Sequence, residues 1–102
     1  MIHEYDKHTK VKELAVPPGG KLSMQRHQER SEHWFIAEGT ATVYTLDSSS
    51  DVELHGVFEQ HKSLHIPVGQ WHQLANEHDT DLKLVEIQYG TNCVEKDIER
   101  TP

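Results

Sequence analysis

Two stretches of this chain decide its fold, Gln25-Arg26-His27 and Pro67-Val68-Gly69-Gln70-Trp71-His72. Gln25 and His27 are two residues apart, so a β-strand directs both side chains to the same face. Glu32 follows after four residues that are typical of a tight turn. The Pro-x-Gly sequence of the second stretch favours another turn, which brings a strand carrying His72 back across the first. The pattern predicts that these four polar side chains meet between strands.

The side chains of Gln25, His27, Glu32 and His72 form a set of nitrogen and oxygen ligands without thiolate. Such a set suits zinc, manganese, iron, cobalt or nickel, and the ligand types alone do not choose among these metals. A hydrogen bond that orients His27 is the alternative role for Gln25, and Glu29 is the alternative to Glu32. We expect one divalent ion at this place, with zinc favoured.

The spacing of these residues resembles that of the cupins. The first cupin motif is matched at every interval by Gly19, Gln25, His27, Glu32 and Gly39. The second motif, Pro-x-Gly-x-x-His-x-x-x-Asn, is matched by Pro67, Gly69, His72 and Asn76. That motif opens with a glycine six residues before the proline, and this chain has His61 there. We expect the departure to alter one turn and to leave the ligands unchanged.

One cupin subgroup is nearer, the cupin domain of type II mannose-6-phosphate isomerases, which is often fused to a mannose-1-phosphate guanylyltransferase. The resemblance lies in residues 22–27, 30–34, 84–90 and 97–100. Gln-x-His at the first ligands and Glu-His-Trp at the third are typical of the subgroup. Two departures are Gln28 and Glu29, where relatives often have histidines, and an end soon after Arg100. The resemblance implies a metal-dependent isomerase of mannose 6-phosphate and fructose 6-phosphate.

Short apolar segments separated by glycine, proline and polar turns predict an all-β protein. The predicted strands cover residues 11–16, 22–27, 33–37, 40–46, 52–58, 63–66, 71–74 and 82–89. Their even spacing favours a sandwich or barrel, and the resemblance implies a single-domain cupin jelly-roll β-barrel over residues 1–102. The charged ends, residues 1–10 and 99–102, are expected to be loose or swapped onto a partner.

Composition limits the partners of this chain. A hydrophobic content of 34% in 102 residues is a lean core, which together with the cupin resemblance favours a homodimer. A net charge of −7 without consecutive Lys or Arg argues against nucleic acid. No apolar stretch suits a membrane span and the first residues lack a signal peptide, so we expect a cytoplasmic location. An anionic sugar phosphate would need local cations that outweigh the overall charge.

Isomerisation also requires a general base and a cation for the phosphate. Glu86 and His33 are the candidate bases, and Glu86 is preferred because His33 alternates away from Glu32 along its strand. Glu86 faces the pocket if Leu84, two residues earlier, faces inward. Arg100 is the candidate phosphate ligand, because its guanidinium can donate a forked pair of hydrogen bonds.

Two other functions use the same fold and ligands, since a fold does not set a function. An iron-dependent dioxygenase would bind its metal through His27, Glu32 and His72, with Gln25 as a spectator. A non-catalytic cupin would bind a sugar or another small molecule without turnover. The Gln-x-His and Glu-His-Trp details favour the isomerase over both.

Overall fold

The computed structural model describes residues 2–6, 8–91, 93 and 97–100, and its regular structure consists of β-strands. The strands are β1 Ile2–Asp6, β2 Thr9–Val16, β3 Gln25–Arg26, β4 Arg30–Glu38, β5 Ala41–Leu46, β6 Val52–Phe58, β7 Ser63–Ile66, β8 His72–Ala75, β9 Leu82–Gly90 and β10 Glu99–Arg100. The all-β prediction is confirmed. Across the described ranges, no helix has the length and apolar character to cross a membrane.

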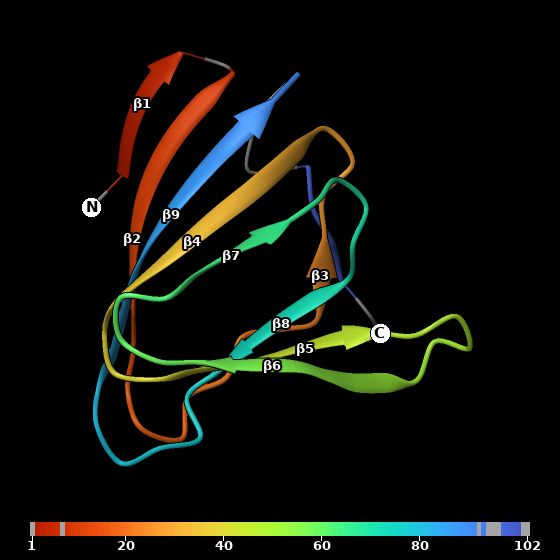
Figure 1. Cartoon of the computed structure of the whole chain (residues 1–102). Helices are drawn as coiled ribbons and strands as arrows, with labels where there is room; N and C mark the ends of the chain where they lie inside the picture. Colours follow the sequence, from red (N-terminus) through yellow and green to blue (C-terminus); the bar gives the residue numbers. More distant parts are fainter. Residues whose placement is uncertain (1, 7, 92, 94–96, 101–102) are drawn as a thin grey trace.

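The strands form two antiparallel sheets that face each other (Figure 1). The first sheet has the order β1-β2-β9-β4-β7, and the second has the order β10-β3-β8-β5-β6. Neighbours in each sheet are mostly distant in sequence, so the chain crosses repeatedly from one sheet to the other. This arrangement places residues from β3, β4 and β8 opposite one another between the sheets.

The predicted strand over residues 22–27 is wrong in its extent, because only Gln25–Arg26 is a strand. Lys21 forms an isolated bridge with Ala75, and the Leu22 backbone nitrogen donates to the Leu74 carbonyl at 2.9 Å. Pairing with β8 then lapses and resumes where Gln25 faces His72. Strand β4 also begins three residues earlier than predicted, at residue 30.

The described residues of both charged ends pair within the chain. β1 pairs with β2 at the edge of the first sheet, and β10 pairs with β3 at the edge of the second. Backbone hydrogen bonds form both pairings, and the expectation of loose or swapped ends stays a prediction. Residues 1, 7, 101 and 102 of that prediction lie outside the described residues.

An apolar core fills one half of the space between the sheets. Its buried members are Val16, Trp34, Ile36, Ala41, Val43, Leu64, Ile66, Leu74, Leu82 and Leu84. Burial alternates with period two along β9, so Leu84, Glu86 and Gln88 share the inner face. Leu84 faces inward, and Glu86, two residues later on the same strand, therefore faces the interior as well.

The other half of the first sheet's inner face is polar. The ladder pairs Gln88 with Lys10 and Glu32, and it pairs Glu86 with Lys12. Residues directly opposite in an antiparallel ladder lie on the same face. Lys10, Glu32, Glu86 and Gln88 are all buried, so the interior holds a concentrated set of charged and amide groups at this end.

His61, which stands where the cupin motif has glycine, adopts a left-handed backbone with φ of 69°. This conformation is uncommon for a residue with a Cβ atom. Two contacts of the turn offset its cost: the His61 ring stacks on Phe35 at 5.9 Å between centroids, and the His61 backbone nitrogen donates to the Ile36 carbonyl at 2.6 Å. The turn thus accommodates a larger residue at the glycine position.

Two glycines of the first cupin motif make a matched test of the turns. Both have positive φ, 79° at Gly19 and 83° at Gly39, so alanine at either costs about 1–2 kcal/mol in backbone strain. A Cβ at Gly39 would also lie 2.3 Å from the Asp81 carbonyl oxygen, while a Cβ at Gly19 would contact nothing within 4 Å. We expect Gly39→Ala to lower the free energy of unfolding more than Gly19→Ala in urea titrations. Equal losses would contradict this steric account.

Candidate metal centre

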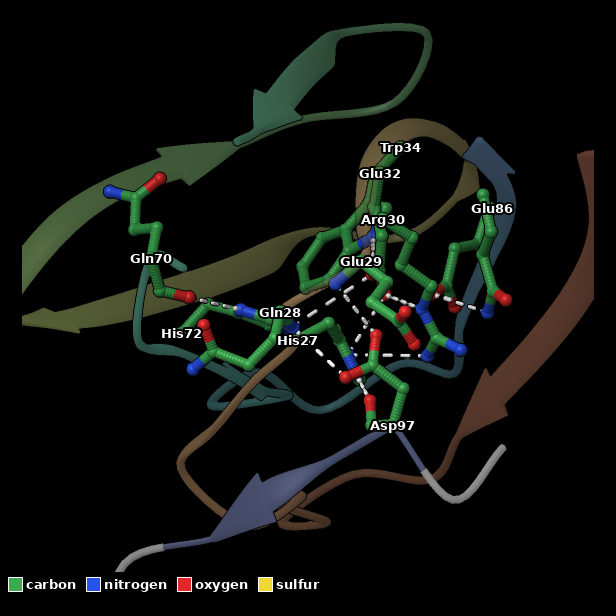
Figure 2. A network of polar contacts seen from close by, with 11 residues as sticks. His27, Gln28, Glu29, Arg30, Glu32, Trp34, Gln70, His72, Glu86 and Asp97 are labelled. Atoms are coloured by element: carbon green, nitrogen blue, oxygen red, sulfur yellow. Dashed lines mark hydrogen bonds and ion pairs between the residues drawn. The ribbon is translucent and has the colours of Figure 1, made fainter. Parts of the chain in front are cut away.

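The structure brings His27, Glu32 and His72 together in a buried cluster at the polar end of the interior (Figure 2). One ligand atom from each residue lies within 4.8 Å of the other two. His27 Nε2 is 3.0 Å from Glu32 Oε2, and His72 Nε2 is 3.9 Å from Glu32 Oε1. His27 directly follows β3, Glu32 lies in β4 and His72 begins β8, so both sheets contribute to the cluster.

Backbone carbonyls orient both histidine rings. His27 Nδ1 lies 2.6 Å from the Asp97 carbonyl oxygen, and His72 Nδ1 lies 2.9 Å from that of Gln70. A carbonyl only accepts hydrogen bonds, so each Nδ1 carries the proton and donates it. A neutral ring in this tautomer keeps its lone pair on Nε2, where a cation held between Nε2 and Glu32 would bind it. This is the tautomer in which a histidine binds metal.

The donor set fits a divalent cation. Among the described residues, His72 Nε2 has no hydrogen-bond partner although it is buried. A buried polar atom without a partner requires an explanation, and an ion is one. A cation bound between the Nε2 atoms and the Glu32 oxygens would supply the missing partner.

Neighbours on its own strand hold the carboxylate of Glu32. Trp34 Nε1 donates to Oε1 at 2.9 Å, and Arg30 Nε donates to Oε2 at 3.3 Å. Arg30 Nη2 also lies 3.2 Å from His27 Nε2. Arg30 is not among the site residues predicted from the sequence. Its place two residues before Glu32 on the same strand is the signal that could have found it.

Gln25 and Glu86 lie on the side of the cluster that opens to a cavity of about 130 Å³. Gln25 is directly opposite His72 in the ladder between β3 and β8. Glu86 accepts a hydrogen bond from Gln88 Nε2 at 3.1 Å. The structure places Gln25 beside the cluster, and its role as a metal ligand stays a prediction.

The two buried carboxyl groups have opposite pKa shifts. Burial raises the pKa of Glu86 well above its ordinary value, and the hydrogen bond and charge of Glu32 raise it further. Burial also acts to raise the pKa of Glu32, but hydrogen bonds with His27 and Glu86 and the charge of His72 outweigh it, so that pKa is lowered. Two adjacent carboxyl groups resist ionising together. Glu32 therefore ionises at a lower pH than Glu86.

Burial lowers the pKa of His72, although the charge of Glu32 acts in the opposite direction. The shift favours the neutral imidazole. A neutral histidine has the lone pair that a metal requires, whereas a protonated one must first lose a proton. The environment of His72 therefore favours ion binding.

The structure separates the remaining catalytic candidates. His33 lies on the face of β4 opposite to Glu32 and pairs with His65 and Ile87 in the neighbouring strands. It is therefore away from the cluster, which leaves Glu86 as the candidate base. Arg100 lines the cavity, and its Nε donates to Ser23 Oγ at 3.3 Å.

The whole chain, residues 1–102, matches a family model described as mannose-6-phosphate isomerase C-terminal. The chain is 38% identical over 90 residues to the alginate biosynthesis protein AlgA of Pseudomonas aeruginosa. It is 40% identical over 90 residues to a mannose-1-phosphate guanylyltransferase of Escherichia coli strain K12. Each alignment covers 88% of this chain and 18% of the relative, so the chain spans less than a fifth of these relatives.

A solved structure shows the shared fold. It is a sugar phosphate isomerase from a cupin superfamily of Silicibacter pomeroyi, which superposes with a TM-score of 0.68 at 20% identity. The match covers 82% of this chain and 52% of that chain. The predicted cupin fold is confirmed.

The raised pKa of Glu86 predicts a measurable pH dependence in the metal-free protein. A carboxyl group that holds its proton more tightly when folded stabilises the fold below its unfolded pKa of about 4.3. That contribution is lost as the pH rises toward the folded pKa. Glutamine keeps the shape and does not titrate. We expect the free energy of unfolding of Glu86→Gln, relative to that of wild type, to rise with pH between the unfolded and the folded pKa. The rise should be up to about 1.4 kcal/mol per pH unit.

Urea titrations of the variant and wild type at about pH 5, 6 and 7 would measure this difference. The midpoint and slope of each titration yield the free energy of unfolding. Glu59→Gln is the matched control, because the Glu59 side chain is exposed. A constant difference between Glu86→Gln and wild type would show that Glu86 titrates normally.

Proposed function

The chain belongs to the mannose-6-phosphate isomerase C-terminal family, and on that premise we propose that it is a metal-dependent isomerase of mannose 6-phosphate and fructose 6-phosphate. One observation carries the proposal: a single cavity adjoins the candidate metal ligands, a buried carboxyl group and several cations. Its lining includes His27, Glu86, Lys12, Arg30 and Arg100. An isomerase of sugar phosphates needs all three kinds of group.

The metal would be held by His27, Glu32 and His72, with Gln25 as a fourth ligand. A divalent cation in this place would polarise the carbonyl oxygen of the open-chain sugar and offset the charge that develops on it. Zinc is the favoured ion, and manganese, iron, cobalt or nickel suit the same ligands. Three or four protein ligands leave positions open, as catalytic sites require.

Glu86 is the proposed general base. In the reaction from aldose to ketose, one proton leaves C2 and one is added at C1, while the proton of the C2 hydroxyl is transferred to the oxygen on C1. A single carboxyl group between the two carbons can remove the first proton and return it. Its raised pKa makes the ionised carboxylate a stronger base for the proton on C2.

Cations at the cavity would attract the phosphate despite the overall charge of −7. Lys12 and Arg30 line it from the first sheet, and Arg100 lines it from β10. Lys10 is buried on the same inner face. A local positive field of this kind can steer an anion into an acidic protein. The chemistry of the lining therefore supports an anionic substrate.

The cavity of about 130 Å³ is smaller than most ligand pockets, which hold roughly 300–1,000 Å³. We infer that the reacting end of the sugar enters the cavity and that the phosphate stays at its rim. Arg100 fits the second role, because it also lines a separate cavity of about 530 Å³. The homodimer stays a prediction.

Turnover should depend on both the metal and its ligands. We expect the zinc-loaded protein to convert mannose 6-phosphate to fructose 6-phosphate, and we expect a chelated sample and His72→Ala to lose this activity. A coupled assay for fructose 6-phosphate measures it. Absence of turnover with zinc, manganese, iron, cobalt and nickel, while an ion remains bound, would favour a binding cupin or an oxygen-using enzyme.

Replacing Arg100 should weaken the contact with phosphate. A lost hydrogen bond to a charged group costs about 1.5–3 kcal/mol, so we expect Arg100→Met to raise KM for mannose 6-phosphate about tenfold or more with a smaller change in kcat. Lys83→Met is the matched control, because Lys83 is an exposed cation that pairs with Glu38. An unchanged KM in Arg100→Met would exclude Arg100 as the phosphate ligand.

A further inference from the structure

The C-terminal segment, residues 97–100, lies against the loop that carries His27 (Figure 2). Asp97 contacts three successive residues of that loop. Its carboxylate oxygens accept hydrogen bonds from the backbone nitrogens of Gln28 at 3.0 Å and Glu29 at 2.9 Å. Its carbonyl oxygen accepts from His27 Nδ1 at 2.6 Å. One residue near the end of the chain thus fixes the loop backbone and a candidate metal ligand together.

The next residues attach the same segment to β3. Glu99 and Arg100 pair with Arg26 and Gln25 in the ladder. The Glu99 carboxylate accepts from Arg26 Nη2 at 2.9 Å and from Gln28 Nε2 at 2.7 Å. These contacts are exposed and do not involve His27. The backbone ladder with β3 therefore anchors the segment, the exposed side chain of Glu99 adds little to it, and Asp97 connects the segment to the metal centre.

The two histidines of the centre differ in how they are oriented. The carbonyl that accepts from His72 belongs to Gln70, two residues away in the same turn. The carbonyl that accepts from His27 belongs to Asp97, 70 positions along the chain. A local turn sets the first contact, whereas the second exists only when the C-terminal segment is in place. The orientation of His27 is therefore the more easily lost.

We propose that Asp97 is a positioning residue for the metal centre, which acts by holding its own carbonyl against His27 Nδ1. The two backbone hydrogen bonds to its carboxylate fix residue 97, and the fixed carbonyl sets the tautomer and rotation of the imidazole. Groups that orient a metal-binding histidine in this way strengthen its binding. The proposal rests on the metal centre of the proposed function and does not depend on the isomerase activity.

Zinc affinity of the full chain tests the proposal, measured by competition with a chromophoric chelator. Loss of such an orienting contact typically weakens metal binding 10–100-fold, so we expect about a tenfold higher Kd for Asp97→Ala. Asp97→Asn keeps one acceptor oxygen and should show a smaller loss. Two controls should bind zinc as wild type does: Glu99→Gln alters the same segment, and Asp79→Asn alters an exposed loop.

A second readout separates positioning from general stability. Cobalt reports its coordination geometry through its visible absorption, so Asp97→Ala should change the spectrum of the cobalt-loaded protein while Glu99→Gln does not. If Asp97→Ala does not fold, Asp97→Asn provides both measurements. Wild-type zinc affinity and an unchanged cobalt spectrum in the folded variants would overturn the proposal.

The outcomes for wild type distinguish this proposal from the isomerase. A wild-type chain that binds neither zinc nor cobalt would overturn both the metal centre and the role of Asp97. A wild-type chain that binds zinc but does not convert mannose 6-phosphate would overturn only the isomerase, and the affinities of the variants would still decide the role of Asp97.

Discussion

The structure depends on how one buried carboxylate, Glu32, is satisfied. An ionised carboxylate between two sheets costs several kcal/mol unless hydrogen bonds and positive charge surround it. Arg30 and Trp34 hold its oxygens from the same strand. His27 and His72 approach it from segments at β3 and β8, in the facing sheet. The sheets are thus joined at this end by polar contacts, as they are joined at the other end by the apolar core.

Strand alternation explains why one small barrel has both an apolar core and a polar site. Along the inner face of β9, Leu82 and Leu84 belong to the core, while Glu86 and Gln88 face the candidate metal centre. A slip of one residue in the register would turn the whole row outward. The core therefore fixes the register that places Glu86 beside Glu32, and core packing and site geometry depend on the same ladder.

Overall charge and local charge have different consequences in this chain. The net charge of −7 argues against a basic surface for nucleic acid, yet Lys12, Arg30 and Arg100 line one small cavity. Arg30 is one of these cavity residues, and inside the barrel it also contacts Glu32 and His27. The same side chain thus contacts the buried carboxylate and lines the cavity.

The sequence by itself determined the all-β class and the meeting of His27, Glu32 and His72, because alternation and turn chemistry are local and the cupin spacing covers all three residues. It did not single out Arg30, although Arg30 lies two residues before Glu32 and therefore shares its face of the strand. It could not show Asp97, because nothing local relates residue 97 to residue 27. Only the tertiary structure decided that contact, through the pairing of β10 with β3, since long-range contacts arise from strands meeting in space.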